Sequence, residues 1–271
     1  MKFRGDQETF PSATWERGKL HAAVLLIAAA FGLTTLTTRA DEPPTALQNV
    51  IFHGQGFLVR TVDPKKEDPR LFLKDDQGNL LHDFTGLEKT VSAQGERLLF
   101  AANAGMFEPD GKPVGLLVQN GAETSPLNLN DGTGNFYMKP NGVFLINAKH
   151  EAFVVESSAY TVLLTPVVWA TQSGPLLVHG GGINPDFNAE SKNLAVRSGV
   201  GVRKDGTIVF SISRLPVNFY TFASLFLNQL KCPNALYLDG TISAFYIPGV
   251  KDNRLHEFGP MIGIVQTGDK K

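Results

Sequence analysis

The stretch "NLAVRSGVGVRKDGTIVFSISR", residues 193–214, gives the clearest indication of the fold. Two apolar runs flank the dipeptide Asp205-Gly206, a frequent connection between antiparallel strands because both positions tolerate a positive φ. Valine, isoleucine and phenylalanine recur in both runs, and these residue types favour strands. The stretch therefore predicts a β-hairpin with buried strands.

Short apolar runs bounded by turn residues recur along the rest of the chain, which has 27 glycines and 16 prolines. Helical spacing is clear only at residues 219–231, after Asn218 as a possible N-cap, and weaker at 86–95. The expected strands are at 47–84 (several short ones), 97–103, 114–120, 142–147, 151–156, 167–172, 234–240 and 260–267. We predict an α+β fold, a mixed and strand-rich sheet with a few packed helices, in a single domain.

The first 40 residues have the pattern of a secretory signal peptide. Arg17 and Lys19 precede an apolar run at 22–36, and the small residue Ala40 follows. We expect cleavage after Ala40 and export of a domain spanning 41–271 to the periplasm or the extracellular space. Thr38 fits a cleavage site poorly, so an uncleaved anchor is the alternative, and it would be the only membrane contact.

Charge and cysteine content exclude several classes of protein. The chain carries 25 Lys and Arg against 26 Asp and Glu, and this balance does not suggest a nucleic-acid-binding protein. Cys232 is the only cysteine, so no internal disulfide is possible, and we expect it to be a small buried residue. Histidines at metal-ligand spacing are absent from the sequence, so zinc has no local support.

Four apolar runs end in glycine mixed with polar residues. Glycine lets backbone amides approach a ligand, and Asn, Gln, Ser and Asp supply the fixed hydrogen bonds of a polar pocket. Any one run taken alone fits a tight turn better, whereas the four together favour a shared pocket. The runs are "AANAGMF" (101–107), "GNFYMKPNGVF" (134–144), "ATQSGPLL" (170–177) and "YLDGTIS" (237–243). They nominate Asn103, Gly105, Asn141, Gln172, Ser173, Gly174, Asp239 and Ser243 as candidate site residues.

Arg197 is the one charged residue inside the apolar run that precedes the Asp205-Gly206 turn. An arginine rarely enters such a run without a partner. Two interpretations are open: a structural salt bridge with Asp239, or a guanidinium that binds a phosphate.

Five segments together resemble the phosphodiester glycosidase family, in its uncovering-enzyme-like bacterial branch. The segments are "NAGMFEPDGKPVGLLVQNG" (103–121), "GNFYMKPNGVFLI" (134–146), "SGPLLVHGGGIN" (173–184), "RSGVGVRKDG" (197–206) and "NALYLDGTIS" (234–243). The resemblance implies hydrolysis of a sugar-1-phosphodiester. The chain departs from the family pattern at Ala104 and at Thr241-Ile242, where the family tends to have glycine, and the second departure puts the substrate in doubt.

Within that resemblance we hypothesise that Arg197 neutralises the phosphate and Asp239 acts as base or electrostatic partner. Asn103, Gln172 and Ser173 would hold sugar hydroxyls, helped by amides near Gly105 and Gly174.

Three alternatives remain open from the sequence. A divalent cation shared by Asp131 and Asp239 is possible, since scattered oxygen ligands leave no readable spacing. The pocket could instead bind a cell-envelope glycan without catalysis. An ordinary glycosidase would need a second carboxylate, for which Glu108 or Asp110 is available.

Overall fold

The computed structural model describes residues 47–162, 165–240, 242–250 and 257–267. The expected hairpin is present. Strand β12 (Ser198–Val202) pairs antiparallel with β13 (Ile208–Ser213), with Val202 opposite Ile208 beside the turn. Every residue of both strands is buried, so both faces of the hairpin are covered by other parts of the protein.

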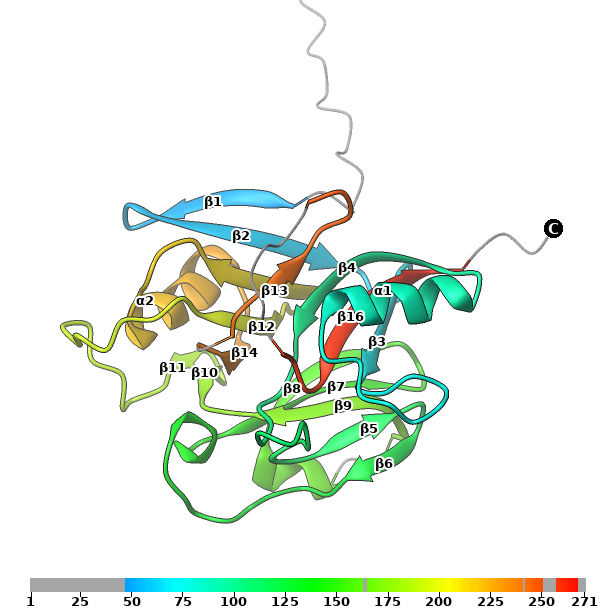
Figure 1. Ribbon diagram of the computed structural model, residues 1–271. Coiled ribbons are helices and arrows are strands. Elements are labelled where there is room, and N and C mark those ends of the chain that lie inside the picture. The colour runs from blue at the N-terminus through cyan, green and yellow to red at the C-terminus, as the bar shows by residue number, and fades with distance from the viewer. Residues whose placement is uncertain (1–46, 163–164, 241, 251–256, 268–271) are drawn as a thin grey trace, which may run out of the picture. The chain divides into compact units, whose positions relative to one another are not determined.

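The hairpin lies in the largest of three sheets (Figure 1). The seven-stranded sheet has the order β1 (Gln48–Phe52), β2 (Gln55–Val62), β13, β12, β14 (Asn234–Asp239), β10 (Leu176–His179), β11 (Gly182–Ile183). The four-stranded sheet has the order β15 (Phe245–Tyr246), β4 (Arg97–Asn103), β16 (Met261–Gln266), β3 (Asp68–Phe72). The five-stranded sheet has the order β6 (Ala122–Ser125), β5 (Leu117–Gln119), β9 (Val167–Ser173), β7 (Gly142–Asn147), β8 (Ala152–Glu156).

The predicted fold class was correct in its high strand content and wrong in two respects. All strand pairs within the described residues are antiparallel, so the expected mixed sheet is not present there. The same residues contain two α-helices, which makes the protein closer to mostly β than to balanced α+β. Parallel neighbours need long crossovers, usually helical, whereas tight turns such as that between β12 and β13 connect antiparallel strands.

Each of the two α-helices begins after a capping side chain, of which only Asn218 was predicted from the sequence. Helix α1 (Phe84–Ala93) begins after Asp83, whose carboxylate accepts the Gly86 N–H at 2.6 Å. Helix α2 (Phe219–Ser224) begins after Asn218, whose amide oxygen accepts the Thr221 N–H at 2.8 Å. The helix expected over 219–231 is α-helical only in this first part. It continues as a π-helix, η3 (Leu225–Gln229), and single 3₁₀ turns, η1 (Asn135–Tyr137) and η2 (Ser157–Val162), occur elsewhere.

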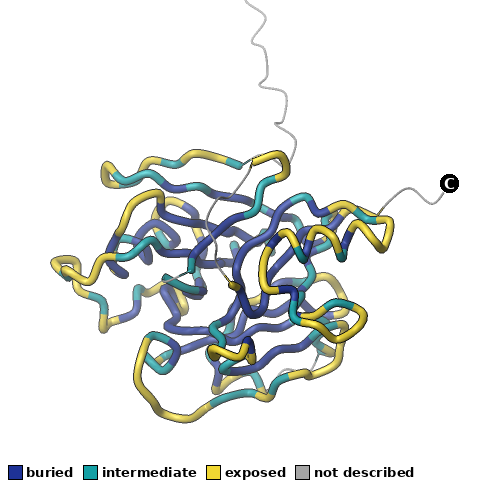
Figure 2. The backbone as a smooth tube through the Cα atoms, viewed as in Figure 1, coloured by how far each residue is buried: buried dark blue, intermediate teal, exposed yellow. Residues whose placement is uncertain are grey.

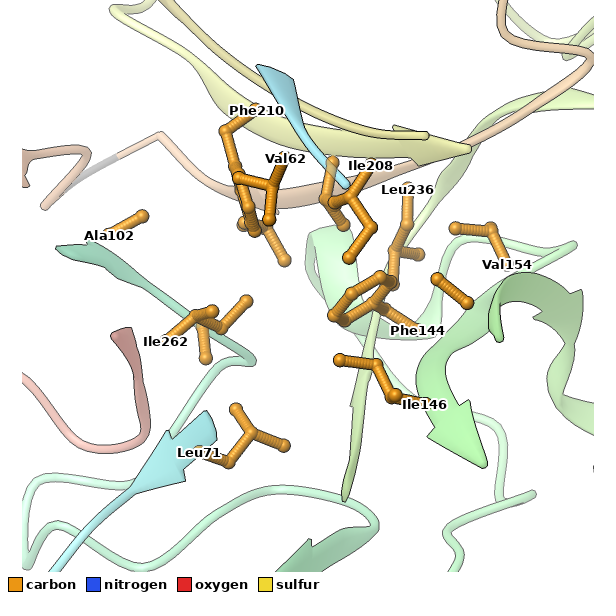
Figure 3. Packing of buried hydrophobic residues seen from close by; sticks show 14 of the residues in the cluster. Val62, Leu71, Ala102, Phe144, Ile146, Val154, Ile208, Phe210, Leu236 and Ile262 are labelled. Carbon is orange, nitrogen blue, oxygen red and sulfur yellow. The ribbon is translucent and has the colours of Figure 1, made fainter. Parts of the chain in front are cut away.

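The main hydrophobic core lies where the three sheets meet (Figure 3). Phe210 and Leu236 come from the seven-stranded sheet, Ile262 from the four-stranded sheet and Phe144 from the five-stranded sheet. Figure 2 shows the strands largely buried and the connecting turns largely exposed. The sheets are therefore held together by side chains from all three, so strand ends from different sheets have fixed positions relative to one another.

The predicted signal peptide, its cleavage near Ala40 and the departure at Thr241 all lie outside the described residues. Within the described residues, no helix is both long and apolar enough to span a lipid bilayer.

Candidate functional site

Three strand ends meet at the junction of the four-stranded and seven-stranded sheets. Asn103 is the last residue of β4, Ser198 the first of β12 and Asp239 the last of β14. Ser198 lies opposite Asp239 in the β12–β14 register. The segment after Asp239 returns to β4, because Phe245 in β15 pairs with Ala102. The fold thus brings together residues that are far apart in the sequence.

Hydrogen bonds connect these strand ends into one polar cluster. The Ser198 hydroxyl donates to Asn103 Oδ1 at 3.0 Å. Asn103 Oδ1 also accepts the Ala244 N–H at 3.2 Å, which ties β4 to the segment after Asp239. The Ser243 Oγ lies 3.1 Å from Ser198 Oγ and 2.6 Å from the backbone oxygen of Asp239. Asn103, Ser198 and Ser243 are all buried, so the cluster is rigid.

The Asp239 carboxylate lies at the half-buried edge of this cluster. Its Oδ1 accepts the Ile242 N–H at 3.2 Å, so the carboxylate caps the turn that follows β14. A carboxylate in this position is already oriented by the turn. It can therefore act on a ligand without a large loss of side-chain entropy.

The side-chain amide nitrogen of Asn103, Nδ2, is a donor that the described residues leave unused. Asn103 is only 3% exposed, and its buried Nδ2 has no hydrogen-bond partner among the described residues. The two bonds to Oδ1 fix the orientation of the amide, so Nδ2 points away from Ser198 and Ala244. An unpaired buried donor costs about 1–3 kcal/mol, which makes an acceptor group of a ligand a favourable partner.

Arg197 is buried behind the cluster rather than inside it. Its guanidinium donates to the backbone oxygens of Val217 at 2.8 Å and Asn193 at 3.0 Å. The guanidinium carbon lies 3.6 Å from the centroid of the Phe219 ring, a cation–π contact. The burial of Arg197 lowers its pKa, but arginine stays charged at any physiological pH.

The salt bridge between Arg197 and Asp239 does not occur among the described residues. Instead, Arg197 Nη1 lies 3.3 Å from the Tyr237 hydroxyl. Burial raises the pKa of Tyr237, while the charge of Arg197 acts in the opposite direction. A Cβ at Gly240 would lie 2.0 Å from that hydroxyl, so Gly240 lets the chain after Asp239 pass close to Tyr237.

Gln172 was expected to hold a sugar, but the oxygen and nitrogen of its side-chain amide each make two hydrogen bonds within the protein. Its Oε1 accepts the N–H groups of Leu116 at 3.0 Å and Asn128 at 2.9 Å. Its Nε2 donates to the Asn128 oxygen at 2.7 Å and to Ser157 Oγ at 3.0 Å. With 1% of its surface exposed, Gln172 is a structural link between β9 and its neighbouring loops.

Four further candidates are also in packed positions. The Ser173 hydroxyl donates to the Leu238 oxygen at 3.1 Å, which joins β9 to the residue before Asp239. The Asn141 amide donates to the Phe136 oxygen at 3.0 Å. The remaining two are glycines for steric reasons, because a Cβ would lie 2.2 Å from a backbone oxygen at Gly105 and 2.5 Å from one at Gly174.

The Gly105 amide is not available to a ligand, since its N–H donates to Thr171 Oγ1 at 3.1 Å. Of the nine nominated residues, the structure therefore gathers Asp239, Asn103 and Ser243, and places Ser173 beside them. It adds Ser198, which the sequence reasoning did not single out although it directly follows Arg197.

The described residues show no set of side chains that could hold a metal ion. No group of three or more His, Cys, Asp or Glu side chains in the described part of the chain is placed to hold a metal ion. Asp131 is exposed in the loop before η1. The shared cation stays a prediction.

The fold and the cluster together define a strand-rich, antiparallel protein with an amide, two hydroxyls and a carboxylate at a junction of two sheets. Comparison with known proteins identifies the family to which the protein belongs. The phosphodiester glycosidase family model matches residues 96–258, and the chain belongs to this family.

Individual relatives agree with this assignment. The uncharacterized protein YigE of Escherichia coli (strain K12) is 34% identical over 189 residues, which is 70% of this chain and 73% of that protein. Among solved structures, the catalytic domain of zebrafish N-acetylglucosamine-1-phosphodiester alpha-N-acetylglucosaminidase, auto-inhibited by its pro-peptide, matches with a TM-score of 0.55 at 16% identity and covers 81% of each chain. A hypothetical protein from Synechocystis matches with a TM-score of 0.52 at 16% identity, over 81% of this chain and 61% of that one. The structural matches support the fold.

Proposed function

We propose that the protein hydrolyses a sugar-1-phosphodiester to free sugar and a phosphomonoester, at the cluster around Asp239. Family membership supports the reaction type. The observation that carries the location is the convergence of Asn103, Ser198 and Ser243 on the end of β14, where Asp239 lies. Fixed polar groups around a carboxylate suit a substrate rich in hydroxyls and charge.

In the proposed reaction, water attacks the anomeric carbon and the bond from that carbon to the phosphate oxygen breaks. The hydroxide part of water stays on the sugar, its proton passes to a base, and the phosphomonoester leaves. Asp239 is that base, or stabilises the positive charge that develops at the anomeric carbon. The buried Asn103 Nδ2 donor, which no residue in the described ranges pairs with, would bind an oxygen of the substrate.

Arg197 takes a different role in this proposal from the one its sequence suggested. Its guanidinium is enclosed by Val217, Asn193 and the Phe219 ring, so direct contact with a phosphate is not part of the mechanism. It positions Tyr237, whose hydroxyl lies against Gly240 just after the carboxylate. Arg197 is therefore a positioning residue.

A second candidate function is binding of an envelope glycan without catalysis. The cap that Asp239 forms on the Ile242 N–H favours it, because a carboxylate with a structural task needs no chemical one. Export of the protein, to the periplasm or outside the cell, is part of both proposals. It rests on the basic and apolar pattern of the first 40 residues.

The test is a panel of sugar-1-phosphodiesters assayed for released sugar, with added divalent cations and with EDTA. Asp239→Asn keeps an oxygen that can accept the Ile242 N–H, so the variant should fold and lose activity by orders of magnitude. Asp75→Asn is the matched control, since Asp75 caps an exposed turn by accepting the Gln77 and Asn79 N–H groups. Full activity in a folded Asp239→Asn protein would refute the assignment.

Release from no compound, together with measurable binding of an envelope glycan, would favour the binding function instead. Loss of activity in EDTA, restored by a divalent cation, would establish the metal requirement.

A further inference from the structure

Two neighbouring clefts border the turn between β12 and β13, away from the candidate site. Their volumes are about 370 Å³ and about 550 Å³. Both are lined by Arg203, Lys204, Asp205 and Pro233, so they adjoin at this turn. We call the two clefts together the turn groove.

The turn groove lies at the opposite end of β12 from the Asp239 cluster. Ser198 belongs to the cluster, and Arg203 follows the last residue of the strand. Five residue steps at the rise of an extended strand correspond to roughly 16 Å. A ligand in the turn groove is therefore too far away to take part in chemistry at Asp239.

The carboxylates of the turn groove are engaged within the protein. Asp63 accepts the Lys65 N–H at 3.0 Å and pairs with Lys66 at 3.2 Å. Glu151 accepts the Asn147 side-chain amide at 2.8 Å. Asp205 accepts the Thr207 N–H at 2.9 Å. Each of these groups already has a donor.

The cations of the turn groove have unused donors. Lys65, Lys204 and Lys231 are exposed, and in the described part of the chain their ammonium groups have no ion pair or hydrogen bond. Arg203 is half-buried and oriented by its Nε–H, which donates to the Leu230 oxygen at 2.9 Å. Its two terminal nitrogens make no hydrogen bond or ion pair with the residues that the structure describes, so they can face a ligand. The turn groove therefore carries four cationic side chains with unused N–H donors against three carboxylates that already accept hydrogen bonds.

We propose that the turn groove is a second, non-catalytic site that binds an oligoanion of the phosphate class. Arg203 offers a planar pair of N–H donors that matches two phosphate oxygens, and the lysines supply further charge around it. Such a site holds a phosphorylated ligand on the protein without cleaving it. The inference goes beyond the proposed hydrolysis and stands whether or not Asp239 is catalytic.

The experiment is calorimetric titration of the purified full-length protein with tripolyphosphate at low ionic strength, where surface charge is least screened. The double variant Lys204→Ala/Lys231→Ala should bind about a hundredfold more weakly, because each of its two lost charge-assisted hydrogen bonds is worth about a factor of ten. Arg203→Met should weaken binding further. The matched control is Lys74→Ala/Lys89→Ala, two exposed lysines outside the turn groove, which should bind as the wild type does.

Three results would overturn the proposal. The first is absence of tripolyphosphate binding by the wild type. The second is equal weakening in the Lys74/Lys89 control, which would show attraction to surface charge in general. The third is equally tight binding of maltotriose, an uncharged probe, which would show a glycan site instead. Because Arg203→Met also removes the Nε–H that donates to the Leu230 oxygen, the lysine variants decide the test if that protein unfolds.

Discussion

Replacing Gln172 by leucine tests whether this residue holds the protein together or holds a sugar. Leucine has a similar size but removes all four hydrogen bonds. Two of the partners, the Leu116 N–H and the Ser157 hydroxyl, belong to residues that are 1% exposed, and each would be left unpaired at a cost of about 1–3 kcal/mol. The N–H and carbonyl groups of Asn128 belong to a half-buried residue, so the loss of their bonds to Gln172 adds less to the destabilisation. Allowing for the apolar gain of leucine, we expect a net destabilisation of about 3 kcal/mol.

For a domain of this size, that loss lowers Tm by roughly 6–12 °C. The assay is thermal unfolding followed by circular dichroism, with sugar release measured well below Tm. Gln119→Leu is the control, since Gln119 makes one side-chain bond to the backbone, to the Leu71 oxygen at 3.1 Å, and should cost about 1 kcal/mol or less. A Gln172→Leu protein with the Tm of the wild type and a greatly raised KM would show that our structural interpretation of Gln172 is wrong.

Three further predictions concern other residues. Ser198→Ala should lower kcat/KM about three- to tenfold with little change in Tm, because it removes one hydrogen bond to Asn103; an unchanged rate would remove Ser198 from the site. Burial raises the pKa of Cys232 to about 12, so a thiol reagent at pH 8 should label it only after unfolding. Burial and the bond to Glu88 raise the pKa of Tyr246 to about 12. Between about pH 10 and about pH 12, the folded protein thus keeps a proton that the unfolded chain loses. The free energy of unfolding therefore falls as the pH rises through this range, and Tyr246→Phe should make denaturant midpoints less sensitive to pH there.

The strands could be predicted because their signals are local. The run at 97–103 became β4 with the expected bounds, and the Asp205-Gly206 turn fixed the hairpin around it. Strand pairing is a long-range property that no short window contains, so the sequence did not reveal that the described pairs are antiparallel. The π-helical continuation after Ser224 was missed for a similar reason, because the apolar spacing fits a regular helix as well.

The candidate site was harder to predict because a buried polar residue has two uses. Gln172 and Asn103 look alike in the sequence, each a polar residue at the end of an apolar run. In the structure Gln172 bonds to three backbone groups and the Ser157 hydroxyl, whereas the Nδ2 of Asn103 has no partner in the part of the chain that the structure describes. Arg197 was correctly expected to have partners, but those partners are backbone oxygens and an aromatic ring. Ser198 was overlooked because a serine among glycine and valine resembles ordinary strand composition.

The long separations within the Asp239 cluster have a consequence for folding kinetics. Asn103 bonds to residues that follow it by 95 and 141 positions, and its strand β4 lies between β15 and the C-terminal strand β16. Contacts between such distant residues form slowly, because the chain must lose much entropy before they become favourable. The cluster can therefore assemble only after nearly the whole domain has been synthesised. A chain released before β16 would contain every residue of the cluster but would lack the strand that pairs with β4 along its length.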